Sequence, residues 1–99
     1  MTLHETQEMI RTTFGAKDAQ RGSAGTFMWF MQEVGELATA LRNGTHEEQM
    51  LEFADVLAWL ATLANIAGVD LDEAMRVKYG RGCPVCLHVP CSCGTAEKP

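Results

Sequence analysis

Apolar residues recur with helical spacing along most of this chain. Between residues 26 and 43 they return every three or four positions, at Phe27, Phe30, Met31, Val34, Leu37 and Leu41. At about 100° per residue, such positions share one face of a helix. Residues 46–67 are apolar on nearly all sides after Phe53. This second pattern predicts a helix that is buried by more than one neighbour.

Capping signals divide the pattern into four predicted helices. A threonine followed three residues later by a glutamate is a capping-box signal, and it occurs at Thr2 and at Thr45. Glycine, which favours helix ends, follows the second and third helices at Gly44 and Gly68. The predicted ranges are about 2–14, 26–43, 46–67 and 70–79. Residues 15–25, with three glycines and few apolar side chains, are predicted to form a loop.

The composition changes abruptly after Gly80. The remaining residues are rich in glycine, proline and cysteine and show no helical period. We therefore expect a helical domain over residues 1–80 and a Cys-rich tail over residues 81–99. The predicted fold class is all-α, a four-helix bundle with this short tail.

Length and charge limit the possible partners. A chain of 99 residues has room for one small domain with a modest core, and an apolar third helix would be buried best in a homodimer. The formal net charge of −5 argues against a nucleic-acid polymer as the main partner. The N-terminus has no apolar signal region, and the longest apolar stretch, residues 56–67, is too short to span a bilayer. We expect a cytoplasmic protein without a membrane partner.

Two acidic pairs are the clearest functional signal. Glu33 and Glu36 form E-x-x-E, and after fifteen residues (37–51) Glu52 and Asp55 form E-x-x-D. Residues three apart share a helix face, so each pair points two carboxylates the same way. One such pair alone usually marks a solvated surface, but two pairs beside apolar residues on consecutive helices are more specific. Four converging carboxylates require a cation, and their oxygens suit Mg²⁺ or Mn²⁺.

The segments FMWFMQEVGELATAL and LEFADVLAWLATLANIAGVDLDEAMRVKYG, within residues 26–80, resemble the MazG-like all-α nucleoside triphosphate pyrophosphohydrolases. The resemblance implies a helical dimer or dimer of dimers. It also implies hydrolysis between the α and β phosphates to a monophosphate and pyrophosphate, for house-cleaning of nucleotide pools. Glu33, Glu36, Glu52 and Asp55 would be the catalytic Mg²⁺ ligands, with Glu36 or Glu52 as general base.

Other residues are candidates for substrate binding. Lys78, in the family-like K-Y element, and Arg81 would meet phosphate charge, or remain solvated cations. Trp59, one turn after Asp55, would stack on a base or pack in the core. Asn65 would contact base or sugar, or be a satisfied core amide.

Three further residues have simpler expectations. Lys17 and Arg21 lie in the predicted loop, where a lid over the substrate would form. Trp29 lies off the main apolar arc and is expected at the surface or at an interface between copies.

The tail carries a second possible metal site. Cys83 and Cys86 form C-x-x-C, and Cys91 and Cys93 follow as C-x-C. Four thiolates at this spacing are suited to tetrahedral Zn²⁺, and His88 is a possible substitute for one of them. Disulfides, a redox switch or unligated thiols are the alternatives.

A different functional class remains open. A helical dimer that binds nucleotide or metal without catalysis, and docks a partner through its tail, would show the same acidic pairs. A di-iron carboxylate bundle is excluded, because neither acidic pair has the histidine three residues on that such proteins use.

Overall fold

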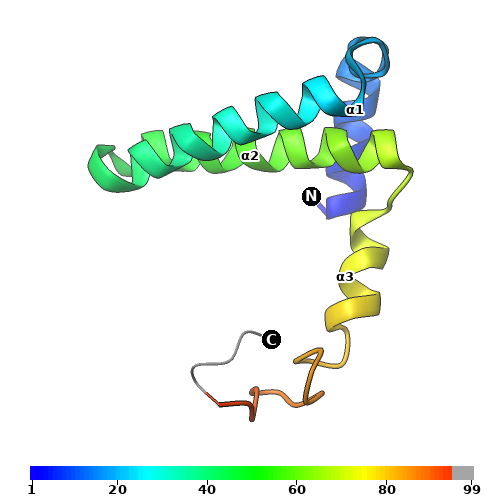
Figure 1. Cartoon of the computed structure of the whole chain (residues 1–99), viewed down its shortest axis with the longest axis vertical. Helices are drawn as coiled ribbons and strands as arrows, with labels where there is room; N and C mark the ends of the chain where they lie inside the picture. The colour runs from blue at the N-terminus through cyan, green and yellow to red at the C-terminus, as the bar shows by residue number, and fades with distance from the viewer. Residues whose placement is uncertain (95–99) are drawn as a thin grey trace.

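The computed structural model describes residues 1–94, and these residues form three α-helices and no strand. Helix α1 spans Leu3–Asn43, α2 spans His46–Ala67 and α3 spans Leu71–Tyr79 (Figure 1). The prediction of an all-α fold is confirmed.

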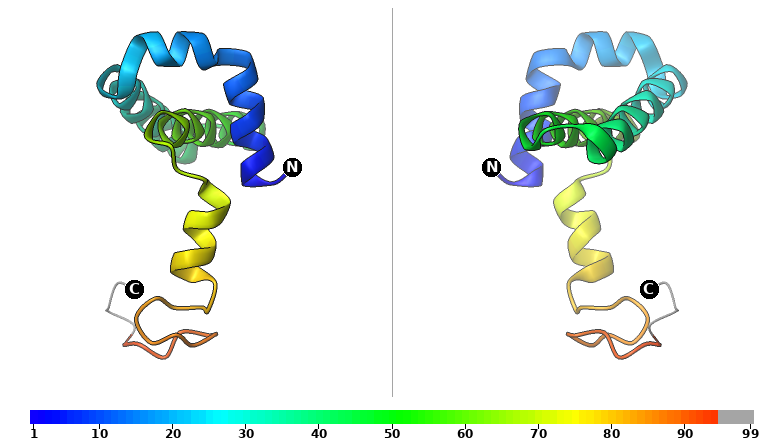
Figure 2. Two further views of the ribbon diagram at one scale, coloured as in Figure 1. Left: turned by 90° about the vertical axis from the view of Figure 1, so that its right-hand side faces the viewer. Right: turned by 90° about the vertical axis from the view of Figure 1, so that its left-hand side faces the viewer.

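The C-terminal half of α1 and the whole of α2 form an antiparallel pair (Figures 1 and 2). The connection is short, because Gly44 ends α1 and Thr45 begins α2. The Thr45 hydroxyl accepts the backbone N–H of Glu48 at 3.2 Å, which satisfies one of the free donors of the first turn. Thr2 makes a complete capping box with Glu5 at the start of α1. Both predicted N-caps are confirmed.

The predicted loop over residues 15–25 is wrong. These residues are helical, and within α1 only Gly22 departs from helical geometry, with φ 78° and ψ 175°. Glycine disfavours a helix by only about 1 kcal/mol. The ion pair of Arg21 with Asp18, at 3.0 Å, has the i,i+3 spacing of a continuous helix. The two helices predicted on either side of the loop are therefore two parts of α1 that meet at a sharp turn.

This turn folds the N-terminal half of α1 across the C-terminal half of α2 (Figure 2). Gln7 is nearly fully buried there and makes several hydrogen bonds. Its amide donates to Asn65 Oδ1 at 3.1 Å and to the Val69 carbonyl at 2.8 Å. Its Oε1 accepts the backbone N–H of Leu71 at 2.8 Å. One side chain thus fastens the beginning of α1 to the end of α2 and the start of α3.

A four-helix bundle is not formed within the described part of a single chain. Helix α3 buries none of its residues and extends away from the α1–α2 pair (Figure 2). The apolar side chains of α3 contact too few residues of α1 and α2 to be buried. The buried apolar residues of the described chain are few and mostly small: Ile10, Ala40, Ala61, Ala64 and Cys83.

Large apolar side chains instead remain exposed along both long helices. On α2 they follow one face at the spacing i, i+3, i+7 and i+10: Met50, Phe53, Leu57 and Leu60. On α1 a similar stripe includes Phe27, Met31 and Leu41.

Among the described residues, α2 is the one helix whose length and composition suit a membrane span, with a mean hydropathy of 1.4. It is longer than the apolar stretch considered from the sequence. However, it carries Glu52 and Asp55, and ionised carboxylates are costly inside a bilayer. An apolar helix with acidic residues on one face is equally suited to contact other helices.

Candidate functional site

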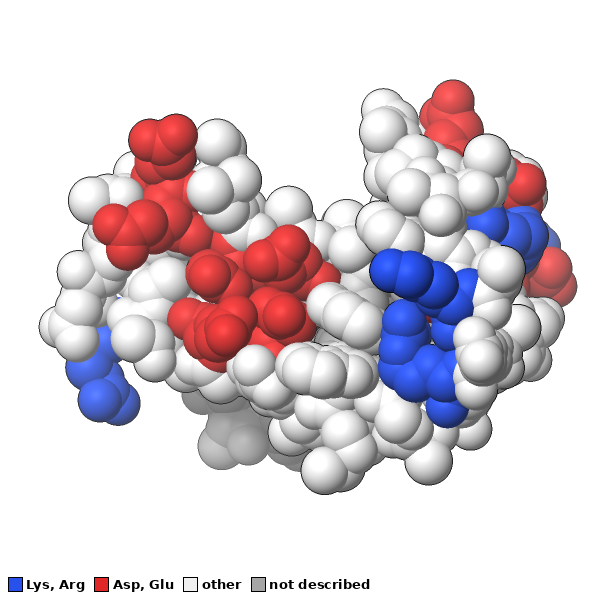
Figure 3. Space-filling model, turned by 90° about the horizontal axis from the view of Figure 1, so that it is seen from above, with Lys and Arg blue, Asp and Glu red and all other residues white. Residues whose placement is uncertain are grey.

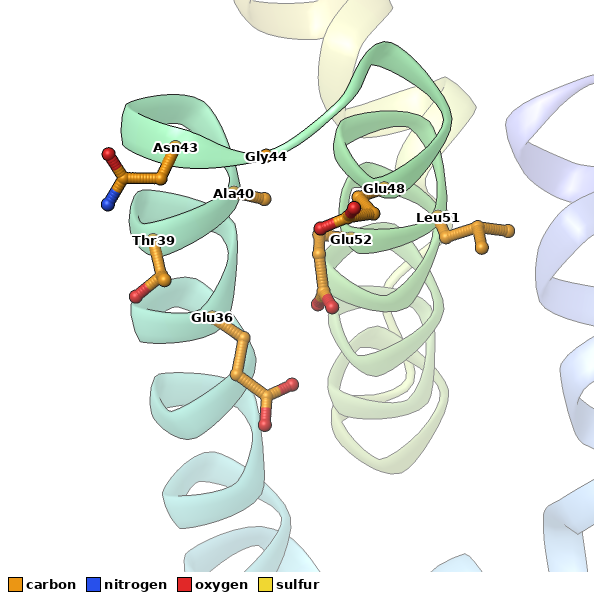
Figure 4. Close-up of a pocket in the computed structure, with 8 residues that line it drawn as sticks. All are labelled: Glu36, Thr39, Ala40, Asn43, Gly44, Glu48, Leu51 and Glu52. Atoms are coloured by element: carbon orange, nitrogen blue, oxygen red, sulfur yellow. The ribbon is translucent and has the colours of Figure 1, made fainter.

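Three glutamates from the two long helices converge on one point. Glu33 and Glu36 lie on α1, and Glu52 lies on α2; one carboxylate oxygen from each falls within 4.8 Å of the others. Figure 4 shows the carboxylates of Glu36 and Glu52 facing each other across the gap between the helices. They line a pocket of about 370 Å³, together with Thr39, Asn43 and Glu48. The predicted convergence of the two helices holds for these three residues.

Two of the carboxylate oxygens are buried without a partner. Neither Glu33 Oε2 nor Glu52 Oε2 has a hydrogen-bond donor among the described residues. A buried charged oxygen without a donor is unfavourable, because it has lost its hydrogen bonds to water. A divalent cation would remove this cost, and clustered carboxylates suit hard ions such as Mg²⁺ or Mn²⁺. The donor set therefore fits the expected metal.

The pKa values of the cluster reflect the same crowding. Burial raises the pKa of Glu33 to about 7, and the neighbouring carboxyl of Glu36 adds to the effect by hydrogen bonding and repulsion. Burial also raises the pKa of Glu52, again with repulsion from Glu36 and Asp55. Without a cation, the site holds its protons more tightly than ordinary glutamates do.

Asp55 lies beside this cluster of three and not within it. Its charge contributes to the raised pKa of both Glu33 and Glu52, so it is close to them. Asp55 and Glu33 both line a second pocket, of about 510 Å³, between the N-terminal half of α1 and α2. Asp55 thus links the carboxylate cluster to a neighbouring cavity.

The second pocket combines aromatic and charged side chains. Trp29 and Trp59 are stacked with their ring centroids 6.3 Å apart and an interplanar angle of 22°. The Arg21 guanidinium lies 4.8 Å from the centroid of Trp59, a cation–π distance. Trp29 is 47% exposed, in line with its expected surface position. The pocket therefore offers flat apolar walls next to the carboxylates. Phe14 and Lys17 also line it.

Asp18 also lines this pocket and was not predicted from the sequence. Its side chain is buried, pairs with Arg21 at 3.0 Å and accepts a hydrogen bond from the Thr62 hydroxyl at 3.2 Å. The misassigned loop concealed it, because a loop aspartate has no fixed direction. The spacing of Asp18 and Arg21, three apart as in a helical ion pair, was the available signal.

Lys17 and Arg21, expected in a flexible lid, instead lie on the helical part of α1 and line the same pocket. Of the residues expected to bind substrate, Trp59 also lines it. Asn65 does not: its Oδ1 accepts from Gln7 at 3.1 Å and from Arg11 at 3.0 Å. It behaves as the satisfied amide that was the alternative expectation.

Lys78 and Arg81 are exposed, on α3 and just after it, and line none of the pockets described here. The described chain alone does not bring these two cations to the carboxylates. Figure 3 shows a group of acidic side chains left of centre and a group of basic side chains right of centre, with uncharged surface between them; further acidic side chains lie at the right edge and a further basic one at the left edge.

The structure is thus a helical hairpin that carries a carboxylate cluster suited to a divalent cation, beside a pocket lined by two tryptophans. Comparison with known proteins agrees. The model of the MazG nucleotide pyrophosphohydrolase domain matches residues 21–86. A curated relative, a dATP/dGTP diphosphohydrolase of Cyanophage S-2L, is 36% identical over 77 residues, which are 78% of this chain and 70% of the relative.

The chain therefore belongs to the MazG nucleotide pyrophosphohydrolase family. It is a nucleotide pyrophosphohydrolase, as the sequence resemblance implied, and enzymes of this family generally use a divalent metal.

Proposed function

We propose that the chain hydrolyses nucleoside triphosphates between the α and β phosphates, giving a nucleoside monophosphate and pyrophosphate, with Mg²⁺ as cofactor. The observation that carries this proposal is the pair of buried, unpartnered oxygens of Glu33 and Glu52, of which Glu33 also lines the pocket that contains Trp29 and Trp59. The proposed physiological role is house-cleaning of nucleotide pools in the cytoplasm.

Each carboxylate has a proposed task. Glu33, Glu36, Glu52 and Asp55 hold the metal, which when bound screens the triphosphate charge and lowers the pKa of water. Glu36 or Glu52 accepts a proton from the attacking water. Glu36 is the more exposed of the two, so it has the easier access to solvent.

The aromatic pocket is the proposed nucleoside site. Trp59 and Trp29 offer faces for a base, and Arg21 and Lys17 carry positive charge beside it. Base–aromatic stacking typically contributes about 1–3 kcal/mol per base. Because the curated relative is named for dATP and dGTP, purine deoxynucleoside triphosphates are the proposed substrate class.

The active form is proposed to be a homo-oligomer. The chain exposes 7208 Å² of surface, whereas a compact monomer of this size exposes about 5,600 Å². The apolar stripes on α1 and α2 would be covered by a second copy. In such an assembly the exposed cations Lys78 and Arg81 are available to the phosphates bound by a neighbouring copy.

The test is pyrophosphate release from a panel of NTPs and dNTPs with Mg²⁺, comparing Glu36→Gln with Glu47→Gln. Both changes remove one negative charge, but Glu47 is exposed near the start of α2 and lies outside the carboxylate cluster. We expect Glu36→Gln to lower kcat at least about 100-fold, within the range for loss of a general base. Glu47→Gln should retain the activity of the unaltered chain.

Two results would contradict the proposal. One is release of inorganic phosphate with no pyrophosphate, which would place the cleaved bond elsewhere. The other is full activity of folded Glu36→Gln, which would remove this residue from the reaction.

A further inference from the structure

Four cysteine sulfurs converge after α3, in a part of the chain that the hydrolytic site does not use. We infer that residues 83–93 bind one structural Zn²⁺ ion through four thiolates. The Sγ atoms of Cys83, Cys86, Cys91 and Cys93 all lie within 4.8 Å of one another, and all four cysteines are free.

The distances between the sulfurs match a zinc tetrahedron. Cys83 Sγ lies 3.8 Å from Cys93 Sγ, and Cys86 Sγ lies 3.9 Å from Cys91 Sγ. In a tetrahedral site with Zn–S bonds of about 2.3 Å, neighbouring sulfurs are about 3.8 Å apart. Disulfide-bonded sulfurs would be only about 2.05 Å apart. The two halves of the motif are thus already at the separation that a shared ion requires.

Backbone amides point at three of the sulfurs. Cys83 Sγ accepts the N–H of Val85 at 3.4 Å, and Cys86 Sγ accepts that of Ser92 at 3.4 Å. The N–H of Cys93 donates to Cys91 Sγ at 3.3 Å. Donors of this kind stabilise the negative charge of a thiolate, the form in which cysteine binds a metal.

A tight turn sets the position of the first two cysteines. The Leu87 N–H donates to the Cys83 carbonyl at 2.7 Å, and the Cys83 N–H donates to the His88 carbonyl at 3.1 Å. Gly82 has φ 104°, and a Cβ there would lie 2.7 Å from the His88 oxygen, so only glycine fits. The backbone therefore turns back tightly next to the sulfurs, and the turn leaves no room for a side chain at position 82.

His88 is not part of the cluster. Its Nδ1 lies 2.6 Å from Ser92 Oγ, and the group of sulfurs within ligand reach contains cysteines alone. This arrangement favours a Cys₄ site over the alternative in which His88 replaces one thiolate.

The segment has no apolar core to hold it otherwise. Residues 81–94 form neither helix nor strand, and Val85, Leu87 and Val89 are exposed. Cys83 is the only one of these residues that is buried. Small units without a core are commonly held by a structural metal. Soft thiolates select zinc, whereas the hard carboxylates of the hydrolytic site select Mg²⁺, so the two sites would not compete for one ion.

Binding requires no redox partner. Four S–H bonds are exchanged for four Zn–S bonds, and the thiol protons pass to the buffer. No electrons are transferred, and the sulfurs stay at the thiol oxidation level.

The test is to purify the whole chain under reducing conditions and to measure its zinc content by elemental mass spectrometry. We expect one zinc per chain, lost in Cys86→Ser and in Cys91→Ser. The ion should remain in Val85→Ala, a control within the same turn. It should also remain in Glu36→Gln, which separates this site from the carboxylate cluster whether or not the hydrolytic proposal holds.

A second measurement guards against variants that fail to fold. Co²⁺ added to metal-free, unaltered protein should give the visible absorption of tetrahedral cobalt thiolate, and stoichiometric Zn²⁺ should abolish it. Absence of both zinc and this absorption would overturn the inference. So would an intact mass that shows disulfides in protein never exposed to oxidant.

Discussion

At the scale of single residues, the main feature is the closeness of Glu33, Glu36 and Glu52. Their oxygens lie within 4.8 Å of one another, and two of these oxygens lack any donor among the described residues. A protein maintains such repulsion where a ligand offsets it, because unpaired buried charge lowers stability. A proton and a metal ion therefore compete for the same carboxylate oxygens.

The first prediction concerns pH. The pKa of Glu33 is raised from 4.5 to about 7, chiefly by burial. The stabilisation from its protonated form is full below about pH 4.5 and is lost as the pH rises through about 7. Because metal competes with this proton, Mn²⁺ affinity should increase about tenfold between about pH 6 and about pH 8. Isothermal titration calorimetry measures this change.

Glu33→Gln provides the control for that titration. It should bind Mn²⁺ more weakly, with most of the pH dependence gone. Equal affinity of the unaltered chain across the whole range would show that Glu33 does not exchange a proton for metal.

Sequence reasoning at this scale succeeded where the signal was local. The three-residue spacing predicted that each acidic pair shares one helix face, and the packing of α1 against α2 brings Glu33, Glu36 and Glu52 together. It failed for Asp18, whose partner Thr62 is 44 residues away, since no local pattern reports such a distant hydrogen bond. It also could not separate Asp55 from the other acids, because their small differences in position depend on how the helices pack.

At the scale of elements, Gly22 determines how α1 is divided. Its φ of 78° and ψ of 175° lie in a region that is essentially restricted to glycine. A Cβ at this position would meet no atom within 4 Å, so any penalty for a larger residue comes from the backbone alone. The sequence predicted an interruption here but made it eleven residues long, because glycine content does not reveal which glycine leaves the helix.

The second prediction follows from that geometry. Gly22→Ala should lower the free energy of unfolding by about 1–3 kcal/mol, the usual cost of such a backbone conformation. Gly15→Ala is the matched control, since Gly15 is helical and its Cβ would make ordinary contact with Arg11 at 3.6 Å. That change should raise stability by up to about 1 kcal/mol.

Urea unfolding followed by circular dichroism compares the two variants. If both changed stability in the same direction and by the same amount, Gly22 would have no special role in dividing α1.

At the scale of the whole molecule, the chain exposes more apolar surface than a small monomer usually does. Met50, Phe53, Leu57 and Leu60 run along one face of α2, and Phe53 is 54% exposed. The sequence indicated burial on several sides of this helix, and one copy of the chain provides only part of it. In the proposed assembly a second copy would supply the remaining cover, and a single sequence does not specify that contact.

The third prediction tests whether a second copy of the chain covers the apolar face of α2. Phe53→Lys should shift the mass measured by light scattering from that of an oligomer toward that of one chain. A lysine within an apolar interface leaves a charge unpaired, which is costly on association. Val77→Lys, at a position 72% exposed on α3, should leave the mass unchanged.

An oligomer that persists in Phe53→Lys would exclude the α2 stripe from the interface. A single-chain mass for the unaltered protein would exclude the assembly itself.

The turn at Gly22 has a further consequence for how this enzyme can be altered. The family match begins at Arg21, so nearly all of the N-terminal half of α1 lies before it, while every carboxylate of the cluster lies after it. Yet that half supplies Asp18, Lys17 and Phe14 to the aromatic pocket. The proposed nucleoside pocket is thus shared between the N-terminal half of α1 and residues after Gly22, among them Trp29 and Trp59, whereas the carboxylates come only from residues after Gly22. Under the proposed function, substitutions confined to the N-terminal half of α1 would change one wall of this pocket and leave every carboxylate of the cluster in place.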